Sequence, residues 1–516
     1  MSQHNPTPLP DDIDQLKQLV LSARSSIVEK ENRITVLEEI VKLFQRKVFG
    51  KSSEKSPGQA ELFDEAELDS IDSEALTAGV TEDNEPSQDK PTAKAKSGRK
   101  PLPKSLERII KEYDLPEADK LCDCGCQKIH IGDEVSEQLD IIPAIIQVIQ
   151  HRRKKYACKT CEGKIKVAGL PDQPIPKSNA SPGLLAHIAV AKYQDSLPLK
   201  RMEIIFARIG IHLPRNTQAN WMIKCRELLM PLYNLLNDQL LSSGYIHMDE
   251  TPVQVLKEPD KSPDSKSYMW VRKTGDPNRP IILFDYASSR RSDVATSLLP
   301  DYQGYLQTDD YPGYNRVAKE KGITQLGCFA HARRKFVEAQ KVSPSKKGKV
   351  SKADMAVELI KRLYQIEKEI KGKEPAEKFK IRQEKSKPQL EKIKTWLDKS
   401  LQNTLPKGKT GNALAYMYKN WSKLTLYIND GRLNIDNNSV ENAIRPFAIG
   451  RKNWMFSDSQ EGANASAMLY SIIETAKAND VEPYIYLKTV FTKLPQAKSL
   501  EDIEKLLPWR VDLLES

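Results

Sequence analysis

The chain changes from a helical to a strand-like residue pattern near residue 244, and this change limits the folds that it can adopt. β-branched and aromatic residues are enriched in four short runs, at residues 245–256, 267–273, 280–286 and 304–309. A helical run at residues 292–299 lies between the third and the fourth of them. Strands and helices that alternate in this way are typical of α/β layer folds. We therefore predict an α/β layer with the order three strands, one helix and one strand.

Acidic residues lie at informative places in this pattern. Asp249 is in the middle of the first run, and Asp309 is at the end of the fourth, just before a Pro-Gly turn. Far downstream, Glu441 lies in the first turn of a predicted helix that opens near Asn438. Two aspartates on strands and a glutamate on a helix can hold two Mg²⁺ ions, because Mg²⁺ prefers carboxylate oxygens and keeps open positions for phosphate and water.

Each of these acids also has a simpler explanation. Asp249 is explained as a surface charge at a strand edge, Asp309 as a cap of the turn, and Glu441 as the capping-box partner of Asn438. Their neighbours Glu250 and Asp310 are rival carboxylates, although adjacent residues in a strand point to opposite faces. We interpret the three acids together as a catalytic set.

Basic residues follow the last of these acids closely. Arg445 lies one helical turn after Glu441, and Pro446 is expected to disrupt the helix. Arg451 and Lys452, close to an aromatic residue at position 454, are suited to backbone phosphates and an unpaired base.

Five of the seven cysteines lie between residues 122 and 161, which predicts a metal site rather than a disulfide framework. The candidate ligands are Cys122, Cys124, Cys126, Cys158 and Cys161. The last two form a CxxC pair, and the first three offer three thiolates for two places. Four thiolates make a closed structural Zn²⁺ site, whereas buried cysteines without a metal are the alternative.

The N-terminal region carries a heptad repeat. β-branched residues recur every seven positions, at Ile13, Val20, Ile27, Ile34, Val41 and Val48. This pattern favours a two-stranded parallel coiled coil over residues 1–55, and the alternative is a single amphipathic helix that docks on its own domain. The acidic and then polar residues 56–100 are predicted to be a flexible linker.

The remaining domain boundaries follow from composition and period. We predict a zinc-binding domain at residues 101–175 and a helical domain at 176–243. In the helical domain, a break at residues 210–214 separates two helices in a helix-turn-helix-like pattern suited to DNA. Residues 244–470 suit an α/β fold of the ribonuclease-H type with a helical insertion at about 340–430, and residues 471–516 form a C-terminal helical segment.

The formal net charge of +10 favours a polyanionic partner. The sequence shows no apolar run of membrane-spanning length and no signal peptide, so we expect a cytoplasmic protein.

Several long motifs resemble the transposases of insertion sequence family 66, whose catalytic domain is of the DDE type. They lie at residues 247–255, 306–311, 327–336, 430–438, 441–446 and 450–454. The resemblance implies that Asp249, Asp309 and Glu441 form the catalytic triad. The chain departs from the family at two places: it has Asp310 where a glycine is usual, and its first cysteine cluster is CxCxC rather than CxxC.

The expected function is therefore DNA transposition, by metal-dependent cleavage of the element ends and strand transfer to target DNA. The cofactors would be two Mg²⁺ ions and a structural Zn²⁺ ion, and the partners double-stranded DNA, a second protomer and accessory proteins of the same element. His331, with Arg333, Arg334 and Lys335, is a candidate to position DNA, although a core histidine and a solvated helix face are equally simple interpretations. The rival functions are a DNA-binding regulator with a non-catalytic core and a nuclease that cuts without joining.

Overall fold

The computed structural model describes residues 12–49, 146–156, 166–320, 322–342 and 350–513. These residues fall into two compact units. The larger unit contains residues 171–513 and the N-terminal helix, and the smaller unit contains the described residues between 146 and 170. No helix within the described ranges is long and apolar enough to cross a membrane.

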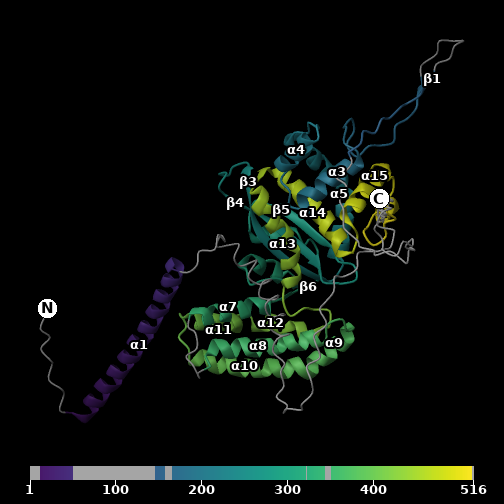
Figure 1. The fold of residues 1–516 in the computed structure, drawn as a ribbon. Helices are drawn as coiled ribbons and strands as arrows, with labels where there is room; N and C mark the ends of the chain where they lie inside the picture. The colour runs from purple at the N-terminus through teal and green to yellow at the C-terminus, as the bar shows by residue number, and fades with distance from the viewer. Residues whose placement is uncertain (1–11, 50–145, 157–165, 321, 343–349, 514–516) are drawn as a thin grey trace, which may run out of the picture. The chain divides into compact units, whose positions relative to one another are not determined.

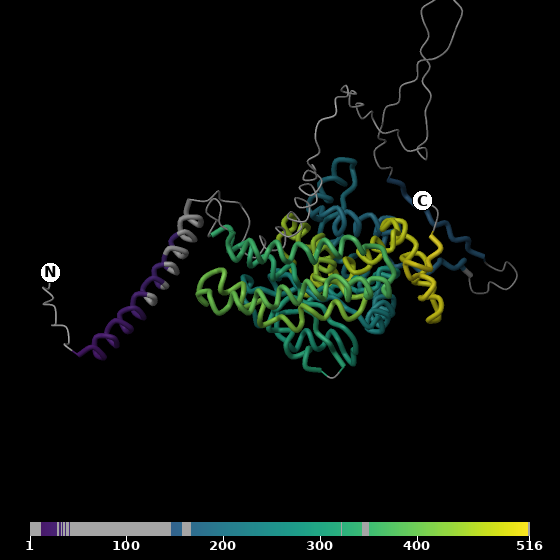
Figure 2. The backbone as a smooth tube through the Cα atoms, turned by 90° about the horizontal axis from the view of Figure 1, so that it is seen from below, coloured from purple at the N-terminus to yellow at the C-terminus, as the bar shows by residue number. Residues whose placement is uncertain are grey.

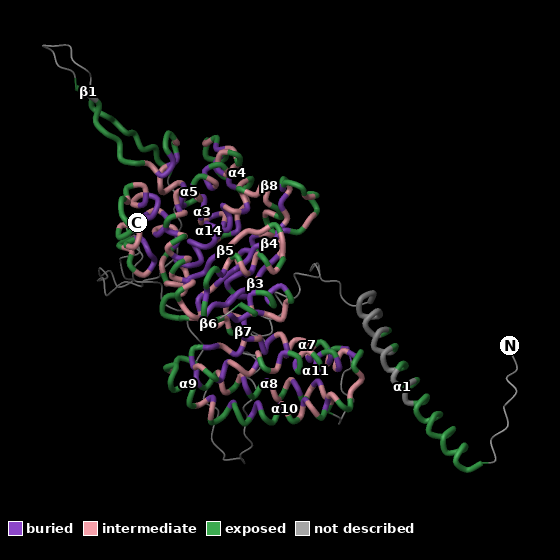
Figure 3. The backbone as a smooth tube through the Cα atoms, turned by 180° about the vertical axis from the view of Figure 1, so that it is seen from behind, coloured by how far each residue is buried: buried purple, intermediate pink, exposed green. Residues whose placement is uncertain are grey.

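The N-terminal helix, α1 (Ile13–Phe49), is 37 residues long. Its described heptad residues have exposed side chains, among them Ile13, Val20, Ile27, Ile34 and Val41. Figure 3 marks the coloured part of α1 as exposed. Exposed apolar side chains at a seven-residue spacing provide the seam that a coiled coil would bury. Pairing with a second helix stays a prediction.

In the smaller unit, two short strands pair antiparallel. They are β1 (Lys155–Tyr156) and β2 (Lys166–Val167), with Lys155 opposite Val167. The segment between them contains Cys158 and Cys161. All five predicted zinc ligands and the predicted linker lie outside the described residues.

A mixed sheet with the strand order β5-β4-β3-β6-β7 forms the centre of the larger unit (Figure 1). β3 (Tyr245–Lys257), β4 (Lys266–Thr274) and β5 (Ile282–Ala287) pair antiparallel in sequence. The short helix α6 (Ser292–Ser297) then leads to the second half of the sheet.

In that second half, β6 (Gly304–Gln307) pairs parallel to β3, and β7 (Ile323–Leu326) pairs parallel to β6. A further short strand, β8 (Ser457–Ser459), pairs with the end of β3. The sheet therefore has the predicted order of three strands, one helix and one strand, and β3 lies at its centre.

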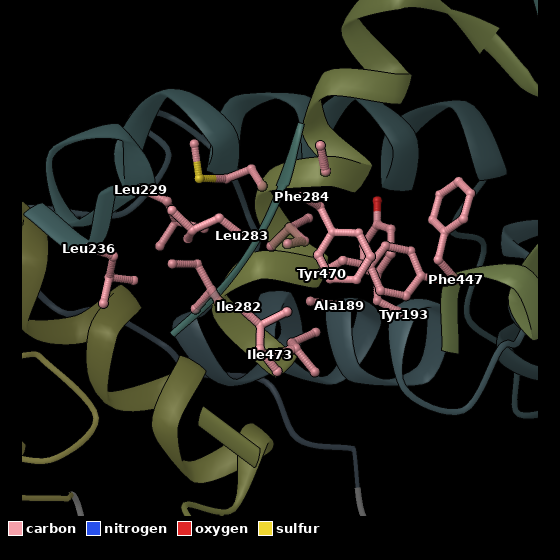
Figure 4. Packing of buried hydrophobic residues seen from close by; sticks show 14 of the residues in the cluster. Ala189, Tyr193, Leu229, Leu236, Ile282, Leu283, Phe284, Phe447, Tyr470 and Ile473 are labelled. Atoms are coloured by element: carbon pink, nitrogen blue, oxygen red, sulfur yellow. The ribbon is translucent and has the colours of Figure 1, made fainter. Parts of the chain in front are cut away.

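Helices cover the sheet. α13 (Asn438–Trp454) packs against β3 and β4, and α14 (Gln460–Ala478) packs against β5 and α5 (Arg215–Leu241). An aromatic cluster joins them: Phe284, Phe447 and Tyr470 are almost completely buried, with ring centroids 5.3 to 6.4 Å apart (Figure 4). Such aromatic pairs stabilise a core beyond the area that they bury.

The predicted boundary at residue 470 lies inside α14, whose buried side chains belong to the same core as the sheet. The next helix, α15 (Pro483–Lys493), packs against α3 (Pro182–Tyr193) and joins that core. Before α5 lies α4 (Leu199–Arg208), so α4 and α5 are the two helices expected on either side of the break at 210–214.

α13 continues through Pro446 to its end at Trp454, so the predicted disruption at this proline is wrong. A proline leaves the carbonyl oxygen four residues earlier without its helical hydrogen bond. That residue, Asn442, is exposed, so water can bind the carbonyl oxygen, while the buried Ile444 and Phe447 hold the helix on the sheet.

A second core lies in the helical insertion, whose helices run side by side in two views (Figures 1 and 2). The helices are α7 (Phe329–Val342), α8 (Lys352–Glu369), α9 (Pro375–Ile381), α10 (Lys387–Gln402), α11 (Lys409–Lys419) and α12 (Trp421–Leu424). Between α9 and α10, the buried Arg382 forms an ion pair with Glu367 and donates to the carbonyl oxygens of Tyr427 and Asp430. These bonds fix the chain where it leaves the insertion.

Gly304 begins β6 in a conformation that other residues rarely adopt, with φ +141°, and a Cβ there would lie 2.3 Å from the carbonyl oxygen of Gly244. That oxygen accepts the Tyr305 N–H, which closes the β3–β6 pairing. We predict that Gly304→Ala destabilises the protein more than Gly372→Ala, a control with φ +81° but open space around it. A positive φ alone costs roughly 1–2 kcal/mol, and urea unfolding measures the excess. Equal losses in both variants would contradict the predicted clash.

Candidate active site

The pairing of β3 with β6 brings Asp249 and Asp309 together. His247 of β3 lies opposite Gln307 of β6 in the parallel register. Continuing that register by two residues brings Asp249 opposite Asp309, which follows the end of β6. Because side chains two residues apart in a strand share a face, Asp249 lies on the face of His247.

Asp249 lies in surroundings that oppose its ionisation. Burial raises the pKa of the Asp249 carboxyl well above its usual range, and the carboxylates of Glu250 and Asp309 raise it further. The amide N–H of Glu250, 2.8 Å from Asp249 Oδ1, and the nearby Arg290 act in the opposite direction. The balance favours the protonated carboxyl of Asp249, and a bound divalent cation would favour the ionised form instead.

The rival carboxylate Glu250 has partners of its own. Its side chain is buried, and Arg290 and the Tyr314 hydroxyl donate to its two oxygens. Arg290 also stacks on the ring of Tyr311, 3.5 Å from the centroid, and lies 4.0 Å from Asp309 Oδ2. Glu250 is therefore held by a cation, and Arg290 connects it to Asp309.

The second rival, Asp310, faces the helical insertion. Its carboxylate lies 3.0 Å from the Lys419 ammonium of α11. Asp309 instead accepts the N–H of Tyr311 at 2.9 Å and belongs to the group around Asp249. The extra acid at position 310 thus has a separate ion partner.

A hydrogen-bonded segment at residues 434–437 is anchored on the same face of the sheet. Gln307 Nε2 donates to the carbonyl oxygens of Gly327 and Asn434, and the Asn434 N–H donates to the Tyr245 hydroxyl. These bonds are partly buried, and they fix the approach to α13 against β3 and β6.

Asn437 completes this anchor at the start of α13. Its Oδ1 is 2.9 Å from His247 Nδ1, and its Nδ2 donates to the Met248 carbonyl oxygen. Its N–H donates to Cys328 Sγ at 3.2 Å. Burial lowers the pKa of His247 to about 4, so this imidazole is neutral at pH 7.

Glu441 lies in the first turn of α13 and contacts α7. Its two oxygens are 3.7 Å from His331 Nδ1 and 3.9 Å from Arg334 Nη2. One ligand atom each from Cys328, His331 and Glu441 lies within 4.8 Å of the others, and no other group of three or more potential metal ligands occurs in the described parts of the chain. Asp249, Asp309 and Glu441 therefore do not form such a group: the aspartates adjoin each other, and Glu441 contacts α7.

The predicted DNA-contacting residues differ in their surroundings. Lys452 is exposed, and the other five, Arg333, Arg334, Lys335, Arg445 and Arg451, are partly buried. Arg451 donates to Thr251 Oγ1 and to the Pro252 carbonyl oxygen, so it ties α13 to β3. The Lys335 ammonium lies over the Tyr416 ring, 4.6 Å from its centroid.

Sequence reasoning missed Arg290 and Asn437 as site residues. Arg290 is in the connection after β5, forty residues from Glu250, and no spacing rule joins them. The sequence feature that could have indicated Arg290 as a site residue is the pair of basic residues that follows β5. Asn437 lay within a recognised motif, but only the fold shows that its side chain bonds to β3.

Comparison with known families covers most of the chain. A family described as "Transposase IS66 family" matches residues 177–465, more than half of the chain. The chain belongs to this transposase family. The IS66 C-terminal element matches residues 471–509, a "zinc-finger binding domain of transposase IS66" matches 119–162, and a "Transposase C of IS166 homeodomain" matches 36–110. The zinc-finger match includes all five predicted ligands and supports zinc binding.

Relatives of similar length occur in Sinorhizobium fredii (strain NBRC 101917 / NGR234). The uncharacterized protein y4qI is 32% identical over 97% of both chains. The uncharacterized protein y4hP is 31% identical over 92% of this chain and 88% of its own. No solved structure matches this IS66 family chain.

The buried His247 predicts a dependence of stability on pH. Its pKa in the folded protein, about 4, is below the usual 6.5, so the unfolded state binds an extra proton between these values. The contribution of His247 to the free energy of unfolding should therefore be fully present above pH 6.5. It should fall by about 1.4 kcal/mol per pH unit as the pH decreases towards 4, because one proton is involved. His247→Gln should reduce this slope in urea unfolding at several pH values, with the exposed His212→Gln as control. An unchanged slope in His247→Gln would contradict the prediction.

The raised pKa of Asp249 predicts that Asp249→Asn stabilises the protein at neutral pH in the presence of EDTA. The folded state holds the proton more tightly than the unfolded state, so an ionised Asp249 destabilises the fold, and asparagine removes that charge. The gain should disappear at acid pH, where Asp249 is protonated in both states.

The measurement is the melting temperature across pH, with and without Mg²⁺. Added Mg²⁺ should stabilise the wild type more than Asp249→Asn. The control Asp310→Asn, which removes the pairing with Lys419, should show no gain in EDTA. A loss of stability in Asp249→Asn at neutral pH would show that its charge is already compensated.

Proposed function

We propose that the protein is a DNA transposase that binds the ends of its insertion sequence and catalyses metal-dependent strand cleavage and strand transfer. Membership of the IS66 transposase family supports the reaction class. The β3–β6 register that brings Asp249 opposite Asp309 is the observation that carries the catalytic assignment.

The sheet supports the proposal that this domain is of the ribonuclease-H type. An antiparallel set of three strands is followed by two strands parallel to the first, in the order β5-β4-β3-β6-β7. The proposed acids lie on the central strand β3 and just beyond its neighbour β6. In that position the backbone of the sheet holds them rigidly.

The residues present fit a divalent cation. Burial raises the pKa of Asp249, and the adjoining carboxylates of Glu250 and Asp309 raise it further, so a bound dication would favour the ionised carboxylate by offsetting that repulsion. Asp249 and Asp309 would hold Mg²⁺, and Glu441, whose carboxylate contacts His331 and Arg334 in this structure, would have to turn towards them to become the third ligand. When bound, Mg²⁺ supplies the positive charge that activates the attacking water and stabilises the leaving 3′ oxygen.

The protein's own groups complete this arrangement. Asp249 must lose its proton to bind the cation, so activity should rise with pH through its raised pKa. Arg290 donates a hydrogen bond to Glu250 and lies beside Asp309. Glu250 is thereby held by a cation, which leaves Asp309 as the acid available to the metal. The neutral His247 and Asn437 fix the start of α13 and hence the backbone that carries Glu441.

Other parts of the chain would bind and pair the DNA ends. α4 and α5, the zinc finger and the exposed Lys452 are the proposed DNA contacts, consistent with the net charge of +10. The exposed heptad of α1 would pair two protomers, so that two element ends meet in one complex.

Asp249→Asn should abolish Mg²⁺-dependent cleavage of element-end DNA while leaving end binding intact, because the amide cannot replace the carboxylate charge. Cleavage would be measured on labelled end DNA and binding by mobility shift, with Asp310→Asn as the matched control that should still cleave. Full cleavage by Asp249→Asn would remove Asp249 from the site. Wild-type protein that binds but never cleaves would indicate a regulator, and cleaved but never joined products a nuclease.

A further inference from the structure

Cys328, His331 and Glu441 come from two helices and meet beside the proposed active site. Cys328 directly precedes α7, His331 is in the first turn of that helix, and Glu441 is in the first turn of α13. Their potential ligand atoms lie within 4.8 Å of one another. Because Cys328 and Glu441 are buried and the His331 side chain is 21% exposed, the cluster is enclosed but open to solvent at His331.

The donor types in this cluster differ from those of a magnesium site. A thiolate, an imidazole and a carboxylate favour Zn²⁺ and similar transition metals, whereas Mg²⁺ prefers oxygen ligands alone. In a tetrahedral site with bonds of about 2.0–2.2 Å, nitrogen and oxygen ligands lie roughly 3.3–3.6 Å apart. The 3.7 Å between His331 Nδ1 and Glu441 Oε1 is close to this separation.

A neighbouring group favours the thiolate form of Cys328, which is the form that binds a metal ion. The Asn437 N–H donates to Cys328 Sγ at 3.2 Å, and such a hydrogen bond stabilises a thiolate. Arg334 Nη2 lies 3.9 Å from Glu441, and Glu441 and a Cys328 thiolate would each contribute a negative charge to a bound ion. The cluster can therefore accept a dication, and its three protein ligands leave a fourth position for water.

We propose that Cys328, His331 and Glu441 form a regulatory site for a thiophilic divalent ion such as Zn²⁺, separate from the zinc finger. An ion held there would occupy the Glu441 carboxylate and keep it from reaching the Asp249–Asp309 pair. Its consequence, inhibition of Mg²⁺-dependent cleavage, rests on the proposed function, whereas metal binding itself does not.

Metal content tests the binding site directly in the full-length protein. After equilibration with Zn²⁺ and removal of unbound metal, the wild type should retain about one zinc ion per chain more than Cys328→Ser, which keeps the zinc finger intact. Cys225→Ser is the matched control, because Cys225 is also a buried thiol but lies outside the cluster. Equal zinc content in all three proteins would overturn the proposal.

A second variant guards against misfolding of Cys328→Ser. His331→Gln changes a partly exposed residue and should also lose the additional zinc ion, and circular dichroism reports whether each variant is folded. Co²⁺ provides a further readout, because a thiolate ligand gives an intense charge-transfer band. The wild type should show a larger band than Cys328→Ser.

The consequence is tested by adding Zn²⁺ to cleavage reactions at constant Mg²⁺, with each protein normalised to its own rate without zinc. Zinc should reduce wild-type and Cys225→Ser cleavage by about tenfold or more and Cys328→Ser cleavage much less, since loss of one metal ligand removes most of the rate. Equal inhibition of all three would overturn the regulatory role while leaving the proposed function in place. If no protein cleaves with Mg²⁺, the proposed function fails, and zinc content still decides whether the site exists.

Discussion

The parallel pairing of β3 with β6 is the constraint on which the rest of the site depends. It sets Asp249 level with Asp309, and it places the Tyr245 and Gln307 side chains where they bind the segment before α13. Because a slip of one residue in a strand turns every side chain to the other face, this one register decides which carboxylates adjoin each other. The close approach of Gly304 to Gly244 holds that register at its start.

The helical insertion separates the two halves of the site in sequence without separating them in space. About a hundred residues lie between β7 and α13, yet the chain returns to β3 through Asn434 and Asn437. Arg382 fixes the exit of the insertion, and Asn437 binds both β3 and Cys328. The insertion thus contributes α7, whose His331 and Arg334 contact Glu441, and α11, whose Lys419 binds Asp310.

Electrostatics divides the acids of this region into groups with different partners. Glu250 has Arg290, Asp310 has Lys419 and Glu441 has Arg334 close by. Asp249 instead has two carboxylates beside it, and its pKa is raised. The acid whose ionisation is opposed is therefore Asp249, whereas Glu441 contacts His331 and Arg334 of α7.

Local sequence determined the strands, the helix between them, the acids that lie on or beside strands, and the start of the helix that carries Glu441. These features depend on residue period and turn chemistry, which act over a few neighbouring positions. Local rules failed at Pro446, where burial of neighbouring side chains on the sheet outweighs one missing hydrogen bond. The predicted boundary at residue 470 falls where the match to the main family ends and that to the C-terminal element begins, although α14 runs through it as one continuous helix.

Only the tertiary structure decided which acids adjoin one another, because strand pairing joins residues sixty positions apart. The tertiary structure likewise pairs Asp310 with Lys419 and Glu250 with Arg290, and it brings Glu441 into contact with α7. A sequence fixes the types of the side chains and their local direction. Their partners and pKa values depend on distances and burial, and these exist only once distant segments have packed together.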